Sequence, residues 1–195
     1  NSRIQICQLE TFDNPVGNMT NLIFRNNQFI NISYAANVDM DGTKWVNNLF
    51  YRVNTGNGGH VFALGGTKGS AYGTQIRNNL FVECGNGLDW VGWYPLPGLF
   101  GISNYDLDAD YNYVCGTGFS AKRTNNNGWG ALGTEIHGIN GGNPRFLNLA
   151  GFDFRLDTAS PLVDRGSTLP TFAEDFYKNP RTDGEWDIGP FRSEE

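Results

Sequence analysis

Two aspartates and a histidine are the first side chains in this sequence whose types and spacing could support chemistry. Asp39 and Asp41 stand two residues apart in NVDMDG, so on a strand both would face the same side. Asp39 and His60 each lie ten residues after a repeated Phe, and Asp89 lies eight after the next one, so it joins them if the register slips around residues 85–87. These groups could serve as general acid, general base and orienting residue. The oxygens of Asp39 and Asp41 could instead bind Ca²⁺, and Asp-Met-Asp-Gly is also a common turn sequence.

A second set of candidates is aromatic. Trp90, Trp93 and Tyr94 lie together in the stretch DWVGWYPLPG, and Trp129 lies in NNGWG. Aromatic rings can bury the apolar face of a sugar while its hydroxyls reach polar neighbours. The same rings could instead cover an apolar exterior beneath a loop. The residue types do not decide between these two interpretations.

Repeated asparagine pairs indicate how these groups are positioned. RNNQF, VNNLF, RNNLF and ADYNY end at Phe29, Phe50, Phe81 and Tyr113, at intervals of 21, 31 and 32 residues. Short runs of Ile, Val, Phe and Tyr lie beside them, bounded by Gly and Asn, which is typical of short strands. We expect each strand to pair with its equivalent one coil further on, with the four rings stacked inside. Asparagine then accepts the backbone conformation of each corner, and the stacked amides form a ladder of hydrogen bonds.

The longer intervals indicate where loops should project. Residues 63–74 and 89–105 are predicted to be insertions in adjacent repeats, so they could wall one lateral groove. The net charge is −6 and Lys and Arg are dispersed, which argues against a nucleic-acid binder. No apolar stretch approaches the roughly 20 residues that span a bilayer. With 26 Gly and 24 Asn residues, the chain is expected to turn often.

The C-terminal part contains a second set of motifs, NPRFLNLAGFDFRLDTASPLVDRGS at 143–167 and DGEWDIGPF at 183–191. Together with the repeats at about residues 20–120, they resemble the right-handed parallel β-helix superfamily of pectate-lyase-like secreted proteins. The positions that match its terminal segment are Pro144, Phe146, Asp153, Phe154, Leu156, Ser160, Pro161, Asp164, Gly166, Asp187, Ile188 and Gly189. The resemblance implies an all-β fold, a right-handed parallel β-helix (β-solenoid) with about five coils. Residues 1–142 would form coils, and residues 143–195 a terminal coil and an irregular C-terminal cap of the same domain.

The resemblance also implies a polysaccharide ligand, because members of this superfamily hold polysaccharides in a lateral groove. In its lyases a Lys or Arg removes the proton beside a uronate carboxylate, whose charge Ca²⁺ or another cation neutralises. Lys68, in a Gly-rich loop, is then the candidate base, and Arg77 is a candidate for substrate binding. Arg25 has the equivalent place two repeats earlier, which favours a structural role for Arg77. No lyase or hydrolase motif matches residue by residue.

Two functions remain open. The first is a secreted or cell-surface protein that binds and cleaves a polysaccharide, as a lyase or a glycoside hydrolase. Its catalytic candidates are Asp39, Asp41, His60, Lys68 and Asp89, with Ca²⁺ at Asp39 and Asp41 as a candidate cofactor, and its substrate-binding candidates are Trp90, Trp93, Tyr94, Arg77 and Trp129. The second is a non-catalytic extracellular β-solenoid for glycan binding, adhesion or self-assembly by end-to-end stacking. It would stack through its N-terminal end, where NSRIQICQLETF is predicted to be a strand and not a cap. His137 is isolated in the sequence, and a loop histidine with satisfied hydrogen bonds is expected there rather than a ligand.

Overall fold

The computed structural model describes residues 5–9, 22–32, 34–38, 42–53, 62–64, 73–84, 91–93, 108–116, 136–182, 184 and 186–193. In strands 5–9, 34–38, 62–64 and 91–93 it describes the path of the chain and not the side chains. The described part is all-β apart from two short 3₁₀ helices, η2 (Leu149–Gly151) and η3 (Pro170–Phe172). Within these residues no helix has the length and apolar character needed to cross a membrane.

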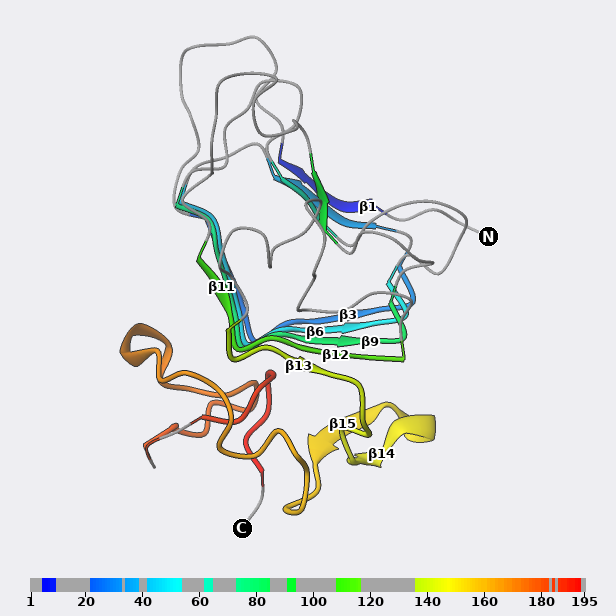
Figure 1. Ribbon diagram of the computed structural model, residues 1–195, viewed down its shortest axis with the longest axis vertical. Helices are drawn as coiled ribbons and strands as arrows, with labels where there is room; N and C mark the ends of the chain where they lie inside the picture. The colour runs from blue at the N-terminus through cyan, green and yellow to red at the C-terminus, as the bar shows by residue number, and fades with distance from the viewer. Residues whose placement is uncertain are drawn as a thin grey trace, which may run out of the picture.

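Three parallel sheets form the body of the protein (Figure 1). Sheet A contains, in spatial order, β1 (Gln5–Leu9), β4 (Tyr34–Val38), β7 (Phe62–Leu64) and β10 (Val91–Trp93). Sheet B contains β2 (Ile23–Arg25), β5 (Lys44–Val46), β8 (Gln75–Arg77) and β11 (Asp108–Asp110). Sheet C contains β3 (Gln28–Ile30), β6 (Leu49–Tyr51), β9 (Leu80–Val82), β12 (Tyr113–Cys115) and β13 (Ile139–Asn140). In the described part, four successive repeats each give one strand to each sheet and β13 adds a fifth strand to sheet C, so the predicted stacking of equivalent parallel strands is confirmed.

The asparagine pair forms the corner between sheets B and C. The first residue of each pair adopts a left-handed backbone, with φ of 54° at Asn26, 55° at Asn47 and 56° at Asn78. Asparagine tolerates this conformation better than most residues. In the fourth repeat Tyr111 occupies the same place, with φ of 59°. The first position therefore sets the direction of the chain.

The second residue of each pair builds the predicted amide ladder. Nδ2 of Asn48 donates to Oδ1 of Asn79 at 3.0 Å, and Nδ2 of Asn79 donates to Oδ1 of Asn112 at 2.9 Å. The same two oxygens also accept the backbone N–H groups of Asn48 and Asn79. These three amides are fully buried, and the ladder supplies the hydrogen bonds that buried polar groups require.

Aromatic rings stack on the interior face of sheet C. Phe29 and Phe50 have ring centroids 4.8 Å apart, and so do Phe50 and Phe81. The next residue in this column is Val114, which pairs with Phe81. Three of the four predicted rings are therefore in the stack.

The prediction for Tyr113 is wrong by one residue. Tyr113 pairs with Leu80, not Phe81, and packs in the cluster on the outward face of the sheet. In this repeat the ladder amide is Asn112, which directly precedes Tyr113. Because side chains alternate between the two faces of a strand, this shift of one residue turns the ring outward.

The two predicted insertions include strand residues. Ala63 and Leu64, at the start of the stretch 63–74, belong to β7, and residues 91–93 of the stretch 89–105 form β10. Sheet A takes one strand from every repeat, including the longer ones. Residues 65–72, 89–90 and 94–105 lie outside the described residues.

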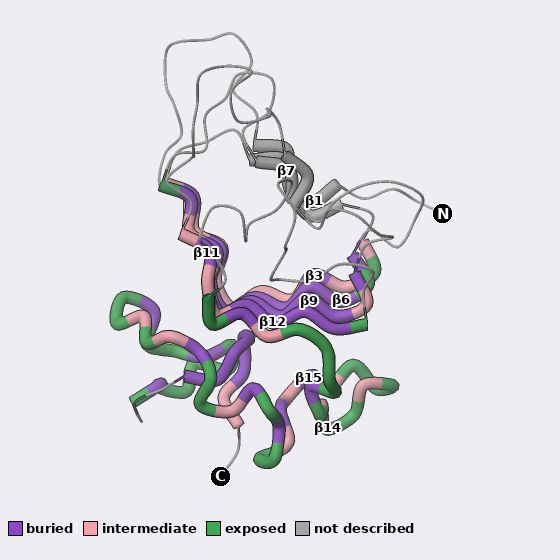
Figure 2. The backbone as a smooth tube through the Cα atoms, viewed as in Figure 1, coloured by how far each residue is buried: buried purple, intermediate pink, exposed green. Residues whose placement is uncertain are grey.

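The C-terminal part covers the outward face of sheet C. Strands β6, β9 and β12 are buried at all three of their positions (Figure 2). A strand that is buried on both faces carries a continuous apolar run, as LFY, LFV and YVC do. The residues that pack together across this interface include Leu49, Leu80, Tyr113, Phe154, Leu156, Leu162 and Ile188.

Residues 143–193 consequently lie beside the stack of strands (Figure 1). They contain an antiparallel pair, β14 (Phe146–Asn148) and β15 (Asp153–Leu156). Their contacts extend from the first repeat, where the Arg25 guanidinium lies 5.8 Å from the Phe172 ring centroid, to Tyr113 in the fourth. This lateral position differs from the terminal cap expected from the sequence, because the apolar outward columns of sheet C need a cover.

Candidate functional site

Most residues that the sequence proposed for a site are not described by the structure. Outside the described residues lie Asp39, Asp41, His60, Lys68, Asp89, Trp90, Tyr94 and Trp129. The backbone of Trp93 lies in β10 and pairs with Leu64 of β7. The side chain of Arg77 is described and lies in β8. Among the described residues, no three His, Cys, Asp or Glu side chains gather in a way that could hold a metal ion.

Arg77 is held by a carboxylate on the neighbouring strand of sheet B. Its Nε lies 2.8 and 2.9 Å from the two carboxylate oxygens of Asp108, and its Nη2 lies 2.6 Å from Oδ1. Nε2 of Gln75 donates to Asp108 Oδ2 at 2.8 Å. Burial opposes ionisation of Asp108, but the hydrogen bonds from Arg77 and Gln75 and the charge of Arg77 outweigh it and lower the pKa of this carboxyl. This ion pair links strands β8 and β11 and fixes the position of the Arg77 guanidinium.

Asp110 orients a histidine. It pairs with Arg77 across strands β11 and β8. Its Oδ1 accepts the backbone N–H of His137 at 2.7 Å, and its Oδ2 lies 2.7 Å from His137 Nδ1. The side chain of His137 is 54% exposed, whereas that of Asp110 is 13% exposed. Because Asp110 occupies Nδ1, a ligand of this imidazole would meet Nε2.

Tyr111 connects the two pairs. Its ring stacks on the His137 imidazole with centroids 4.4 Å apart and an interplanar angle of 15°. The Cζ atom of Arg77 lies 5.7 Å from the centroid of the same ring. A bulky residue in the left-handed region is a rare conformation that costs about 1–2 kcal/mol. At this corner the fourth repeat has an aromatic ring despite that cost, whereas the other three repeats have Asn26, Asn47 or Asn78.

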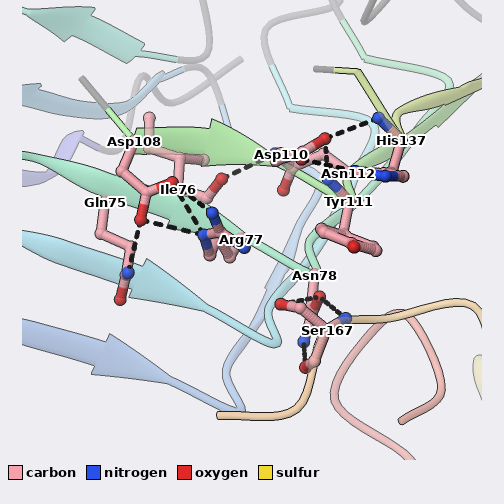
Figure 3. Close-up of polar contacts among 10 residues, drawn as sticks. All are labelled: Gln75, Ile76, Arg77, Asn78, Asp108, Asp110, Tyr111, Asn112, His137 and Ser167. Atoms are coloured by element: carbon pink, nitrogen blue, oxygen red, sulfur yellow. Dashed lines mark hydrogen bonds and ion pairs between the residues drawn. The ribbon is translucent and has the colours of Figure 1, made fainter. Parts of the chain in front are cut away.

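The corner beneath this ring is fixed by hydrogen bonds. Nδ2 of Asn112, the residue after Tyr111, donates to the carbonyl oxygen of Ile76 at 2.7 Å. One repeat earlier, Asn78 accepts the backbone N–H of Ser167 at 2.8 Å and donates to the Ser167 carbonyl at 2.8 Å (Figure 3). The site is thus built on backbone that both the ladder and the C-terminal part immobilise. We refer to Gln75, Arg77, Asp108, Asp110, Tyr111 and His137 as the Tyr111 cluster (Figure 3).

The Tyr111 cluster offers two kinds of chemistry. Its stacked rings and charged groups can bind the apolar face and the hydroxyls of a sugar. An imidazole oriented by a carboxylate can also accept a proton as a general base. The cluster contains no serine, threonine or cysteine, and its one hydroxyl is the phenol of Tyr111.

Sequence reasoning identified only one member of the cluster, Arg77. The expectation that His137 is a loop residue with satisfied hydrogen bonds is confirmed, since it pairs with Asp110 and also stacks on Tyr111. The sequence does single out Tyr111. When the repeats are aligned on their ladder asparagines, the fourth repeat has a tyrosine at the position where the other three have asparagine. No such signal existed for His137, which lies 27 residues after its partner in a stretch without repeats.

Comparison with protein-family models and with curated protein sequences finds no match to this chain. Functional inference therefore depends on the geometry of the Tyr111 cluster and of the sheets that carry it.

Proposed function

We propose that the chain forms an extracellular right-handed parallel β-helix that binds a polysaccharide on the outward face of sheet B, at the Tyr111 cluster. Three parallel sheets with one strand per repeat, joined at a corner by an amide ladder, support the β-helix. The resemblance of the repeats and of the C-terminal motifs to pectate-lyase-like secreted proteins supports the class of ligand and the extracellular location.

The observation that carries the binding function is the conformation of Tyr111. Backbone strain at a bulky residue persists where the surrounding structure and a use for the side chain maintain it. The ring lies against the exposed His137 imidazole and close to the Arg77 guanidinium. The exposed His137 imidazole, supported by the Tyr111 ring, gives a planar surface for the apolar face of a sugar, and Asp108 and His137 Nε2 can bond to its hydroxyls.

The surrounding face suits a polymer. Lys44, Gln75 and Asp108 occupy successive positions of one column across β5, β8 and β11. Such columns repeat at the strand spacing of about 4.8 Å, so a long chain can meet several polar side chains in a row. A polysaccharide therefore fits this face better than an isolated small molecule.

A single substitution tests the binding function. Tyr111→Asn removes the ring but supplies the residue that the other repeats use, so the protein should fold normally. Affinity electrophoresis in gels containing polygalacturonate, alginate, xylan or a neutral glucan should show retardation of the wild type and about tenfold weaker binding by the variant, the loss expected for one stacking contact. Phe152→Asn is the matched control, since Phe152 is an aromatic residue that also has left-handed backbone but lies on the C-terminal part. Equal retardation of Tyr111→Asn and wild type by the bound polymer would refute the site.

The Asp110–His137 pair favours a second function, cleavage of the bound polymer. Held at 2.7 Å by the carboxylate, the imidazole could take a proton at Nε2. Removing the proton beside a uronate carboxylate, with departure of the glycosidic oxygen, would produce an unsaturated sugar that absorbs ultraviolet light. Activating a water would produce a new reducing end without that absorbance. The other candidate catalytic groups remain Asp39, Asp41, His60, Lys68 and Asp89, with Ca²⁺ at Asp39 and Asp41.

Assays of both products separate these functions. If the chain cleaves the polymer that it binds, His137→Gln should abolish product formation and retain polymer binding. If wild-type protein binds a polymer and releases neither product from it, cleavage is excluded for that polymer and the non-catalytic function stands. Measurement of mass in solution tests the related proposal of end-to-end stacking, because a strict monomer at all concentrations contradicts it.

A further inference from the structure

A cavity of about 480 Å³ lies on the C-terminal part, and no member of the Tyr111 cluster lines it. Strand β15 contributes Arg155, the turn 175–180 contributes Asp175 and Tyr177, and the last described stretch contributes Arg192 and Ser193. Ligand pockets commonly have volumes of about 300–1,000 Å³. The cavity is therefore large enough for a sugar unit.

Two arginines on different stretches line it, and hydrogen bonds hold both of their guanidinium groups. Arg155 donates from Nε to Asp153 Oδ1 at 3.0 Å and from Nη2 to Oδ2 at 2.7 Å. Arg192 donates from Nη1 to the Pro180 carbonyl oxygen at 3.3 Å. These bonds restrict both side chains, so less conformational entropy is lost when a ligand binds them. Arginine is the side chain whose planar donors match a carboxylate best.

The carboxylate in the wall maintains the shape of the pocket. Asp175 is buried, its Oδ1 accepts the backbone N–H of Asn179 at 2.8 Å, and its Oδ2 accepts Nδ2 of Asn179 at 3.1 Å. The Oδ2 atom also accepts the backbone N–H of Arg192 at 3.4 Å. The two arginines and Asp175 give the lining a formal charge of +2 − 1 = +1. If Asp153, the partner of Arg155, is included, the local charge is zero, whereas the whole chain has a net charge of −6. An anion is therefore repelled less here than the overall charge implies.

Tyr177 provides an apolar surface beside these cations. Its side chain is 55% exposed, yet its ring is supported by Phe176, with centroids 5.2 Å apart, and by Phe191, with centroids 5.7 Å apart. An exposed but immobilised ring suits the apolar face of a pyranose. The pocket thus combines a surface for a sugar ring with donors for a carboxylate.

We propose that this pocket binds a hexuronate, a sugar unit that carries a carboxylate. The guanidinium groups of Arg155 and Arg192 bind the carboxylate, and Tyr177 packs on the ring. This site goes beyond the proposed function, since the Tyr111 cluster requires no charge on the polymer, whereas this pocket selects an acidic sugar.

Trigalacturonate and its methyl ester, which have the same sugar backbone but differ in charge, form the matched pair of probes. Titration calorimetry should show about tenfold tighter binding of the acid, the preference expected for a charge-assisted hydrogen bond, and a decline of that affinity with added salt. Arg192→Gln should reduce the preference for the acid, and Tyr177→Ala should weaken both ligands together. The control Arg145→Gln, at an arginine that pairs with Asp157 and does not line the cavity, should change neither value.

Three results would overturn the proposal. Equal affinity for the acid and the ester removes the role of the carboxylate. Equal affinity for acetate and trigalacturonate removes the role of the sugar. If Tyr111→Asn loses trigalacturonate binding, the ligand lies at the Tyr111 cluster and not in the pocket. If Tyr111→Asn retains trigalacturonate binding and Arg192→Gln loses it, the ligand lies in the pocket. Failure of this site is thereby distinguished from failure of the proposed function.

Discussion

Nδ2 of Asn79 donates a hydrogen bond to Oδ1 of Asn112 at 2.9 Å, across 33 residues of chain. Asn79 is in turn the acceptor for the amide of Asn48, 31 residues before it. The bond explains why this chain repeats asparagine in pairs. The first position needs a residue that tolerates left-handed backbone, and the second needs a short side chain that donates and accepts at once.

Asn79→Ala should destabilise the protein by about 3 kcal/mol. The substitution removes the acceptor of both the backbone N–H and the Nδ2 of Asn48, and an unsatisfied buried group costs about 1–3 kcal/mol. Urea unfolding followed by circular dichroism measures the loss. Asn27→Ala, at the end of the ladder, should cost about 1 kcal/mol, because Oδ1 of Asn48 keeps the backbone N–H of residue 27. Equal losses at the two positions would contradict a cooperative ladder.

The first position of the pair allows a comparison between two corners. Asn47 and Asn78 both have left-handed backbone, which glycine adopts freely. The buried amide of Asn47 has no hydrogen-bond partner in the described part of the chain, whereas that of Asn78 bonds Ser167 as donor and as acceptor. Asn78→Gly should therefore destabilise the protein by about 2 kcal/mol more than Asn47→Gly, as two lost bonds of about 1 kcal/mol each require. The same free energy of unfolding for both variants would show that Ser167 contributes nothing.

Much of the fold was predictable because the corner residues leave a local signature. Left-handed backbone and a stackable amide both favour asparagine, and the interval between pairs equals the length of one repeat. The stacking of Phe29, Phe50 and Phe81 follows from that interval alone. The error at Tyr113 arose because the fourth repeat can be aligned with the others either on its aromatic ring or on its ladder amide. These two alignments differ by one residue, and the structure follows the amide.

The Tyr111 cluster and the lateral packing were less accessible to prediction. His137 lies 27 residues after Asp110 in a stretch of sequence without repeats, so no regular spacing indicates that the two residues pair. The apolar triplets LFY, LFV and YVC do indicate a sheet that is buried on both faces, and this signal calls for a covering segment. The triplets do not identify the segment that covers sheet C. Gly189 and Leu162 contact the sheet from irregular backbone, which has no periodic pattern in the sequence.

The ion pair of Asp108 with Arg77 should make stability depend on pH in the acid range. The folded state lowers the pKa of Asp108 below its ordinary value of 3.8, so the pair stabilises above about pH 4 and this contribution is lost as pH falls through the lower folded pKa. Because the Asp108 side chain is 42% exposed, Asp108→Asn should cost less than about 1 kcal/mol at pH 6. Urea unfolding of both proteins should show that the difference shrinks towards pH 2. A difference that grows on acidification would reverse the sign of this linkage.

Gly189 holds the C-terminal part against sheet C, and a substitution at this glycine should detach the C-terminal part from the sheet. Its N–H donates to the Asn78 carbonyl at 2.9 Å, and a Cβ atom at this position would lie 2.5 Å from Cδ1 of the buried Leu80. Gly184 has a similar backbone, with φ of 101° against 112°, but among the described residues a Cβ there meets nothing within 4 Å. Gly184→Ala should therefore cost about 1–2 kcal/mol from backbone strain alone, and Gly189→Ala about 1–3 kcal/mol more from overpacking. Limited proteolysis should then cleave residues 143–193 faster in Gly189→Ala than in Gly184→Ala, since opening of this part exposes its loops. Equal cleavage rates would mean that the contact with Leu80 does not hold the C-terminal part in place.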